Sequence, residues 1–527
     1  MHALKSPFLR PISRPTSPAP PSRTDTETPP IDRSARPLTK LSSLTNFNRK
    51  PSPAPVSTPT QATLTHDGSY LDALSLKLNE AASKALSQPV SAVATPDTLG
   101  GKRPIPVGRG RTLGELIAAE LNTSQGNSHL QRAILRLLQR PLTVLLSNLS
   151  TALLPLLSNP AFSNPSAPSV QNPNLNAIQA HALGIATFAG ELLDCLDELK
   201  LDASHDHKGD GLLVIKEGLG SVMKRVINPL MSGIKTDLVP LIQDLEKGNV
   251  AAVPTTTGTK VANGTKAPAN LHPSIATLQT LMPIYARALG RYCSTKSSEA
   301  SLATFLISIM WNAVVALSHR PSSPRSRANS ASATSAASMS MTFIKRFGGS
   351  TTPPNTPPAS RFTMKLPGSR PPSPPALAPS AAEDANALYN LLSTLPKPAP
   401  SKDNLPSEAV KEAFEALAAL TALLSALGNT TEIRDDLDLD ILTEGLPVPI
   451  ALPILLRWSG HGEPQVIPAM LGTSETEYRS GCLSGFGRAD ECAYSIAHRM
   501  VEILRSEADP DPKTSIVIGF LEECLAH

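Results

Sequence analysis

The sequence predicts an all-α fold, an irregular helical bundle or helical-repeat-like body in two parts, with long disordered Ser/Pro-rich segments. Apolar residues recur at helical spacing over most of the chain, and almost no stretch alternates apolar and polar residues at period two. The chain has 52 prolines among its 527 residues, twice the ordinary share, while apolar residues still make up 40%. Folded helices interrupted by proline-rich stretches account for both numbers.

Charge separates these two kinds of sequence. The net charge of +4 is a cancellation, because residues 1–66 carry 9 basic and 3 acidic side chains and residues 300–382 carry 8 basic and none acidic. Residues 383–527 carry 10 basic and 23 acidic side chains. We therefore expect basic disordered segments beside an acidic folded part.

Composition and periodicity divide the chain into five regions. They are a disordered basic Ser/Thr/Pro-rich tail (1–66), a short amphipathic helix with a basic loop (67–111), a helical domain (112–318), a disordered basic linker (319–380) and an acidic helical domain (381–527). The last region either forms a second unit or packs on the first to make one body with a long insertion.

The N-terminal half begins with a helix expected over residues 69–86, followed by Pro89. Thr112 and Glu115 have the spacing of a capping box, which predicts that a helix begins there. A helix over 129–140 is expected to kink or break at Pro141.

Later helices follow from the same apolar spacing. They are expected at 142–158, 176–200, 211–247 with interruptions at Pro229 and Pro240, 274–293, 298–318, 381–394, 407–427, 447–458, 475–483, 489–506 and 514–526. The acidic stretch 432–444 is expected to be a loop.

Residues 301–318 contain no charged side chain, so a membrane-spanning helix has to be considered. Ser301, Thr304, Ser308 and Asn312 form a thin polar stripe on this helix, which is typical of a central helix in a bundle. We therefore favour a buried helix over a membrane span.

No catalytic, cofactor-binding or metal-binding constellation emerges, and we expect no enzyme activity, no cofactor and no bound metal. The polar cluster from Asp202 to Asp210 lacks the spacing of a calcium loop. Cys482, Cys492, His461 and His498 lack zinc-finger spacing. The basic tails lack interleaved aromatic residues, so nucleic acid is not an expected partner.

The N-terminal sequence and the cysteines predict the cellular compartment of the protein. No apolar signal-peptide core occurs near the N-terminus. The five cysteines are widely spaced and odd in number, which favours free thiols in a reducing compartment. We expect a location in the cytoplasm or nucleus, with membrane association as the alternative.

One pattern repeats in the basic segments. Arg-x-x-Ser-Pro occurs around Ser17, Ser52, Ser323 and Ser373, and Ser330 has a basic residue three positions upstream. Thr-Pro steps at Thr352 and Thr356 accompany it. These residues are the candidate phosphorylation sites, for proline-directed or basophilic Ser/Thr kinases, because disordered sequence gives a kinase an accessible substrate.

A second short motif lies in the N-terminal tail. Pro18, Pro21 and Arg23 match the Pro-x-x-Pro-x-Arg pattern that SH3-type domains bind as a polyproline II helix. The sequence therefore favours a non-enzymatic adaptor or scaffold that binds other proteins and is regulated by phosphorylation of its disordered segments. The alternative is a peripheral or single-span membrane-associated protein that uses 301–318 and its basic flank.

Overall fold

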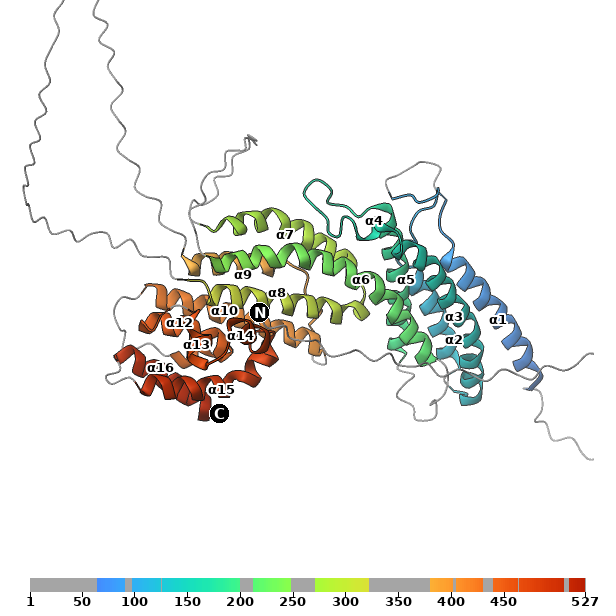
Figure 1. Ribbon diagram of the computed structural model, residues 1–527. Coiled ribbons are helices and arrows are strands. Elements are labelled where there is room, and N and C mark those ends of the chain that lie inside the picture. The colour runs from blue at the N-terminus through green and yellow to red at the C-terminus, as the bar shows by residue number, and fades with distance from the viewer. Residues whose placement is uncertain are drawn as a thin grey trace, which may run out of the picture. The chain divides into compact units, whose positions relative to one another are not determined.

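The computed structural model confirms the all-α fold (Figure 1). It describes residues 64–90, 97–124, 126–199, 212–247, 271–321, 380–400, 404–429, 439–462, 464–506 and 511–526. These ranges hold sixteen α-helices and no β-strand, with isolated bridges joining Lys102 to Val90 and Leu99. The two segments predicted to be disordered lie almost entirely outside the described residues.

All described helices belong to one compact unit, residues 62–527. A single cluster of buried apolar side chains extends from Leu74 in the first helix to Leu521 in the last. The helices on either side of residues 322–379 therefore share one hydrophobic core.

Five helices form the N-terminal part of this unit. They are α1 (Leu64–Leu86), α2 (Arg109–Thr123), α3 (Ser128–Leu157), α4 (Pro160–Ser163) and α5 (Ala177–Glu198). α1 packs on α3, and α2 packs on α5. Gly110 and Gly114 allow α2 to approach α5 closely, because a Cβ atom at Gly114 would lie 2.4 Å from Cβ of Cys195.

We predicted that the helix would kink or break at Pro141, and the break was wrong. α3 is continuous from Ser128 to Leu157 and contains both Pro141 and Pro155. Leu138, Pro141, Leu142 and Leu145 are all buried. A proline inside a helix costs about 3 kcal/mol, and burying three leucines offsets more than that.

The capping-box prediction at Thr112 was also wrong. α2 begins three residues earlier, after Gly108, which has a left-handed backbone with φ of 92°. The carboxylate of Glu191 in α5 accepts hydrogen bonds from the backbone N–H groups of Gly108 (2.7 Å) and Gly110 (3.0 Å). The cap comes from a distant helix, so the local sequence does not reveal it.

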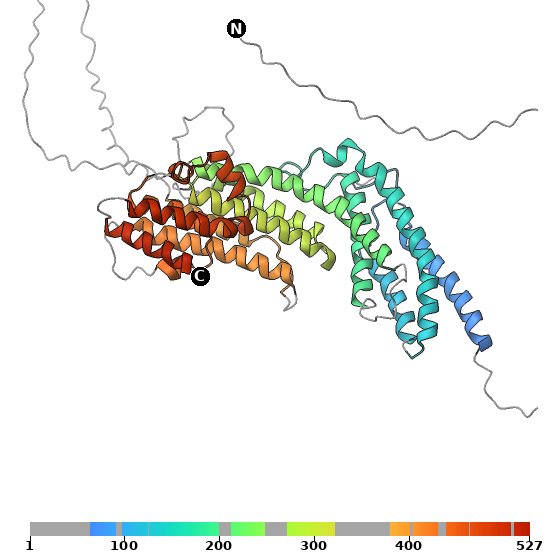
Figure 2. The ribbon, with the colours of Figure 1, turned by 60° about the horizontal axis from the view of Figure 1, so that its bottom comes forward.

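The central helices are α6 (Leu212–Gln243), η3 (Asp244–Lys247), α7 (Pro273–Tyr292), η4 (Lys296–Ser298) and α8 (Glu299–Ser318). α6 runs unbroken through Pro229 and Pro240, where interruptions were predicted. Figures 1 and 2 show α8 between α6 and α10, and it packs against both.

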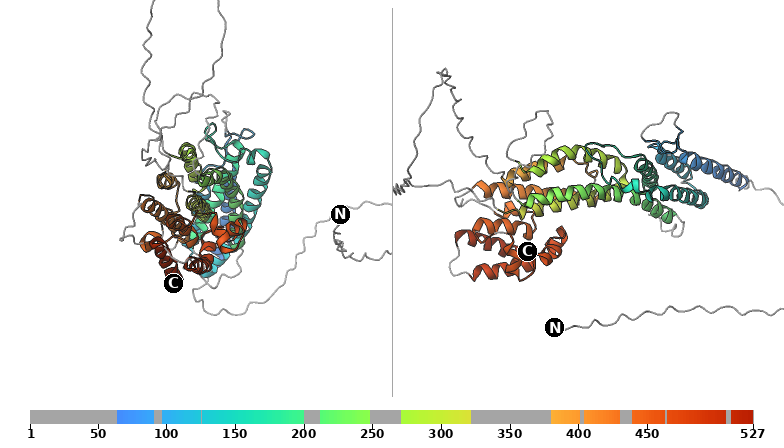
Figure 3. Two further views of the ribbon diagram at one scale, coloured as in Figure 1. Left: turned by 60° about the vertical axis from the view of Figure 1, so that its left-hand side comes forward. Right: turned by 45° about the horizontal axis from the view of Figure 1, so that its top comes forward.

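The C-terminal helices complete the unit. They are α9 (Ala381–Ser393), α10 (Leu405–Asn429), α11 (Leu439–Thr443), α12 (Val448–Ser459), α13 (Val466–Leu471), α14 (Glu475–Gly481), α15 (Phe486–Arg505) and α16 (Pro512–Ala526). α9 packs on α7, and α12, α15 and α16 pack on one another (Figure 3). The short helix α11 occupies part of the acidic stretch that was predicted to be a loop, and α13 was not predicted.

α8 corresponds to the uncharged segment 301–318. The indole N–H of Trp311 donates a hydrogen bond of 2.7 Å to the carbonyl of Leu483, and the Trp311 ring packs edge-on against Phe486. Ser308 accepts through its carbonyl from the Asn312 side chain, so part of the polar stripe is satisfied within the helix. These contacts attach the turn between α14 and α15 to α8.

Candidate functional site

The predicted modification and ligand residues lie outside the described residues. These are the phosphorylation candidates Ser17, Ser52, Ser323, Ser330, Ser373, Thr352 and Thr356, and the polyproline candidates Pro18, Pro21 and Arg23. The structure does describe both attachment points of the segment 322–379, at Pro321 after α8 and at Ser380 before α9. We call the surroundings of these points the loop junction; it comprises the end of η3, residues 315–321, the start of α7, the start of α9 and α14.

A buried ion pair joins the two attachment points. Nη1 of Arg320 lies 2.5 Å from Oδ2 of Asp384, and both side chains are buried. The other carboxylate oxygen of Asp384 accepts a hydrogen bond of 2.9 Å from the backbone N–H of His272. One carboxylate therefore holds Arg320, two residues before segment 322–379, together with α9 after that segment and with His272, which precedes α7.

The last turn of α8 is held at the same place. Nη2 of Arg457, in α12, donates a hydrogen bond of 2.7 Å to the carbonyl of Ser318. A cation at a helix C-terminus interacts favourably with the unpaired carbonyls there. Arg457 therefore stabilises the end of α8, two residues before Arg320.

The end of η3 is attached to α14. Arg479 binds the carboxylate of Glu246 through both terminal nitrogens, and its Nε binds Glu475 within α14. These two carboxylates raise the pKa of Arg479 above its ordinary value, with the hydrogen bond to Glu246 as the largest cause. The residue preceding segment 248–270 is Lys247, whose ammonium lies 2.7 Å from Oδ1 of Asp244.

A pocket of about 600 Å³ opens at the loop junction, and we call it the His319 pocket. Its lining comes from the end of α6, η3, α8 and the residues that follow it, the residue before α13, and α14. The polar lining residues are Gln243, Asp244, Glu246, Lys247, Asn312, His319, Gln465 and Arg479, and the apolar ones are Pro240, Val315, Ala316 and Pro321.

His319 is the most deeply buried titratable group in this pocket. Its Nδ1 lies 3.1 Å from the carbonyl oxygen of Val315 and 2.9 Å from the hydroxyl of Ser318, while its Nε2 has no hydrogen-bond partner. Burial, and to a smaller extent the nearby Arg479, lowers the pKa of His319 to about 4. The imidazole is therefore neutral at physiological pH.

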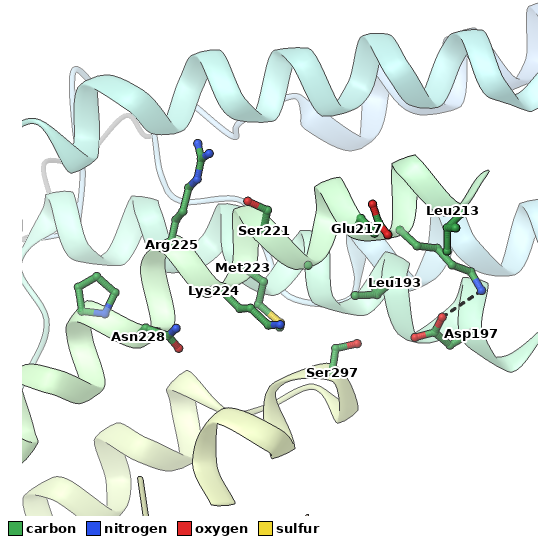
Figure 4. Close-up of a pocket in the computed structure, with 13 residues that line it drawn as sticks. Leu193, Asp197, Leu213, Glu217, Ser221, Met223, Lys224, Arg225, Asn228 and Ser297 are labelled. Carbon is green, nitrogen blue, oxygen red and sulfur yellow. Dashed lines mark ion pairs between the residues drawn. The ribbon is translucent and has the colours of Figure 1, made fainter. Parts of the chain in front are cut away.

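A second, more open groove of about 990 Å³ lies along α6, between α5 and η4 (Figure 4). Asp197 of α5 pairs with the buried ammonium of Lys216 at 3.1 Å, and Figure 4 shows Arg225 pointing away from this pair. Lys224, Ser221, Asn228 and Ser297 also line the groove. Three cationic and two anionic side chains line the groove (Lys216, Lys224, Arg225, Asp197 and Glu217), so it has no uniform charge with which to select a ligand.

Three arginines, Arg132, Arg136 and Arg140, recur at every fourth position of α3, and Arg136 and Arg140 are exposed. Cys482 and Cys492 lie near each other, and burial is the largest cause that raises the pKa of Cys482 to about 12.

Within the part of the chain that the structure describes, no group of three or more His, Cys, Asp or Glu side chains is placed to hold a metal ion. The cluster from Asp202 to Asp210 lies outside that part.

The residues of the loop junction were not identified from the sequence. Arg320 lies two residues before segment 322–379 and Asp384 five residues after it, and their opposite charges near its two ends were the available signal. Comparisons with family models, with curated proteins and with solved structures found no match to this chain.

Proposed function

We propose that this protein is a non-enzymatic adaptor or scaffold whose helical body binds another protein and whose basic Ser/Pro-rich segments are phosphorylated to regulate that binding. The buried Arg320–Asp384 ion pair supports this proposal most directly. It ties both ends of segment 322–379, which carries Ser323, Ser330 and Ser373, to one place on the helical body. A phosphate added anywhere in this segment would therefore stay tethered near the loop junction of the helical body.

Electrostatics supplies the mechanism of regulation. The segment 300–382 has 8 basic and no acidic side chains, and residues 383–527 carry 23 acidic against 10 basic side chains. Each phosphate adds a charge of about −1.5 to −2 at neutral pH, so four phosphates neutralise most of the basic charge. In the unmodified protein the basic segment associates with the acidic helices, and phosphorylation releases it.

The partners and the compartment follow from the same proposal. Proline-directed or basophilic Ser/Thr kinases would modify the segment in the cytoplasm or nucleus. An SH3-type domain would bind Pro18, Pro21 and Arg23, and a peptide of residues 14–26 with Pro18 and Pro21 replaced by alanine should lose that binding.

Crosslinking tests the release mechanism. At low salt, a reagent that joins lysines to carboxylates should link Lys345 or Lys365 to acidic residues in 383–527, because opposite charges attract most strongly there. Replacing Ser323, Ser330 and Ser373 by Asp should reduce these links, and the matched triple Ala variant should retain them. Unchanged links in the triple Asp variant, or an absence of phosphate at every candidate site in protein isolated from cells, would contradict the proposal.

The second candidate is a peripheral or single-span membrane-associated protein. Two helical stretches, Ser128–Leu157 and Lys296–Ser318, are long and apolar enough to cross a bilayer, with mean hydropathies of 1.2 and 1.9. In their most apolar windows, 28% and 61% of the residues are buried in the structure. The burial of α8 and the Trp311 hydrogen bond favour a core helix, so the scaffold remains our first proposal.

Carbonate extraction of a cell membrane fraction tests the single-span form of the second candidate, because the treatment also releases peripheral proteins. A scaffold is expected in the supernatant, because salt-dependent and protein-mediated attachment does not survive the treatment. Retention in the membrane pellet would favour the single-span form of the second candidate and contradict the first candidate.

A further inference from the structure

Two of the five cysteines lie together where α14 ends and α15 begins. Cys482 is the first residue after α14, and its backbone N–H donates a hydrogen bond of 2.8 Å to the carbonyl of Tyr478. Cys492 lies in the second turn of α15, on the same side as the buried Ala489 and Ile496. Both cysteine side chains pack against the hydrophobic core, and they share a hydrogen bond.

The buried ring of Tyr478 lies beside both of these cysteines. Tyr478 is 2% exposed, and burial is the largest cause that raises the pKa of its hydroxyl. Cys482 and Cys492 both contribute to this raised pKa through their charge. Because an electrostatic interaction weakens with distance, a side chain that responds to both sulfur atoms places them in one small region.

The turn that carries Cys482 is anchored to α8 and has open space at two glycines. The carbonyl of Leu483 accepts the hydrogen bond of 2.7 Å from the indole of Trp311. No atom from elsewhere in the described chain lies within 4 Å of the position that a Cβ would take at Gly481 or Gly485. A disulfide requires its sulfur atoms to be about 2 Å apart, and this space allows the small movement that brings two neighbouring thiols to that distance.

Cys195 and Cys293 have neighbours of a different kind. The buried thiol of Cys195 donates to the carbonyl of Arg111 at 3.8 Å. The sulfur of Cys293 lies 3.9 Å from the thioether sulfur of Met231. Neither a carbonyl nor a thioether can form a disulfide, so these two cysteines serve as comparison residues within the same chain.

The Cys482 and Cys492 thiols are within reach of a small oxidant. Both residues are half-buried, so both keep some surface in contact with solvent. A second thiol beside the first makes oxidation reversible, because it captures the oxidised sulfur as a disulfide before further oxidation. We infer that Cys482 and Cys492 form a redox-modification site, at which a hydroperoxide converts the two thiols to a disulfide.

The conversion takes place in two steps. At neutral pH Cys482 is a thiol, because burial is the largest cause that raises its pKa to about 12, and a thiolate is the attacking species, so the first attack falls to Cys492. The Cys492 sulfur attacks one oxygen of the hydroperoxide, the O–O bond breaks, and the other oxygen leaves as water or an alcohol with the proton from Cys492. The sulfur of Cys482 then attacks the Cys492 sulfenic acid, the S–O bond breaks, the S–S bond forms, and the oxygen leaves as water with the proton from Cys482. The two thiols lose two electrons and two protons, and the hydroperoxide is reduced by the same two electrons.

The disulfide links α14 covalently to α15. α14 carries Arg479, which binds Glu246 of η3 at the loop junction. Closing the chain between residues 482 and 492 restricts the unfolded state of this region, so oxidation stabilises the attachment of α14. Thiol reductants reverse the reaction by thiol–disulfide exchange. The modification does not depend on the proposed scaffold function.

Trypsin separates the two cysteines, because it cleaves after Arg488, which lies between them. The reduced full-length protein is treated with stoichiometric hydrogen peroxide, its remaining thiols are alkylated, and the tryptic digest is analysed by mass spectrometry. We expect peptides 480–488 and 489–499 to appear joined by a disulfide before Cys195 or Cys293 is modified. Dithiothreitol added before alkylation should restore the two separate peptides. Amide exchange in α14 should be about tenfold slower in the oxidised protein.

Three serine variants assign the roles of the cysteines. Cys482→Ser should abolish the linked peptides and leave a sulfenic acid on Cys492 that dimedone labels, because the second thiol is missing. Cys492→Ser should slow the oxidation of Cys482 about tenfold or more, since Cys482 remains protonated. Cys524→Ser, in α16, is the matched control and should leave the linked peptides unchanged.

Two results on the natural chain would overturn the inference, and neither depends on the folding of a variant. The first is alkylation of both Cys482 and Cys492 after the peroxide treatment, which would show that no disulfide forms. The second is a disulfide that joins either cysteine to Cys524 or to a second copy of the chain. Unchanged amide exchange in α14 after oxidation would contradict the stabilisation of its attachment.

Discussion

Arg320 and Asp384 form a buried ion pair although 64 positions separate them in the sequence. Asp384 is fully buried and Arg320 is 4% exposed, so neither charge is solvated by bulk water. The backbone N–H of His272 completes the contacts of the carboxylate. The pair holds together the beginning of α7, the end of α8 and the beginning of α9.

Asp384→Asn should lower the free energy of unfolding by about 3–5 kcal/mol, because it leaves the charge of Arg320 buried without a counter-ion. Urea denaturation at neutral pH measures the change. Glu491→Gln, which breaks an exposed pair with Arg488, is the matched control and should cost under about 1 kcal/mol. The double variant Arg320→Leu/Asp384→Asn should recover much of the loss, since the Asn carbonyl still accepts from His272. If the double variant is as unstable as Asp384→Asn, the unpaired charge is not the cause.

Glu191→Gln should destabilise the protein by about 1–2 kcal/mol, because the capping carboxylate loses its charge and one of its acceptor oxygens. The amide proton of Gly110, which donates to Glu191, should exchange with solvent faster in the variant. The control is Glu115→Gln, an exposed residue of α2 whose nearest cation is Arg111 at 3.9 Å. Similar losses in the two variants would mean that α2 does not depend on this cap.

Gly114→Ala should destabilise the protein by about 1–3 kcal/mol through overpacking, because the new methyl group would meet Cβ and Sγ of Cys195 at 2.4 and 2.7 Å. Gly290→Ala in α7 is the matched substitution, since no atom lies within 4 Å of its added methyl group. It should stabilise the helix by about 0.5–1 kcal/mol, as alanine replaces glycine in a helix interior. Thermal denaturation of both variants tests the pair, and equal effects would argue against close packing of α2 on α5.

Acidification should destabilise the protein through His319. Burial and Arg479 hold its folded-state pKa near 4, below the value of about 6.5 in an unfolded chain. Between these values only the unfolded chain binds the proton, so the free energy of unfolding falls as pH is lowered, by about 3 kcal/mol in total. His319→Phe cannot take up this proton, so its stability relative to the natural protein should rise as pH falls from 7 to 4. Tyr478→Phe, which changes no group that titrates in this range, should show a difference that stays constant. If the stability difference between His319→Phe and the natural protein also stayed constant with pH, His319 would not have the low pKa in the folded state that this prediction requires.

The sequence predicted the positions of the helices better than their ends and interruptions. α5, α8 and α15 lie within about three residues of their expected bounds, because apolar spacing over five or six turns is a strong signal. The sequence predicted interruptions at Pro141, Pro229 and Pro240 because the free-energy cost of a proline in a helix depends on the local sequence alone. The burial of apolar residues beside these prolines offsets the cost, but it depends on tertiary packing, which the local sequence does not show.

The candidate site was harder to predict for a related reason. The motif residues around Ser323 and Ser373 repeat along the chain, so a search by pattern finds them. Arg320, Asp384 and His319 belong to no motif, and each acquires its role only when α7, α8, α9 and α14 meet. Opposite charges 64 residues apart have no preferred pairing until the fold brings them together.

Two side chains of α5 cap the starts of two other helices. Glu191 accepts from the N–H groups at the start of α2, and one turn later Asp194 accepts from the backbone N–H groups of Lys296 and Ser297, at the start of η4. If α5 opened, both starts would lose their caps in the same event. Fraying of α2 and of the η4–α8 start should therefore be coupled, and amide protons in both segments should exchange through a common opening whose free energy is that of releasing α5.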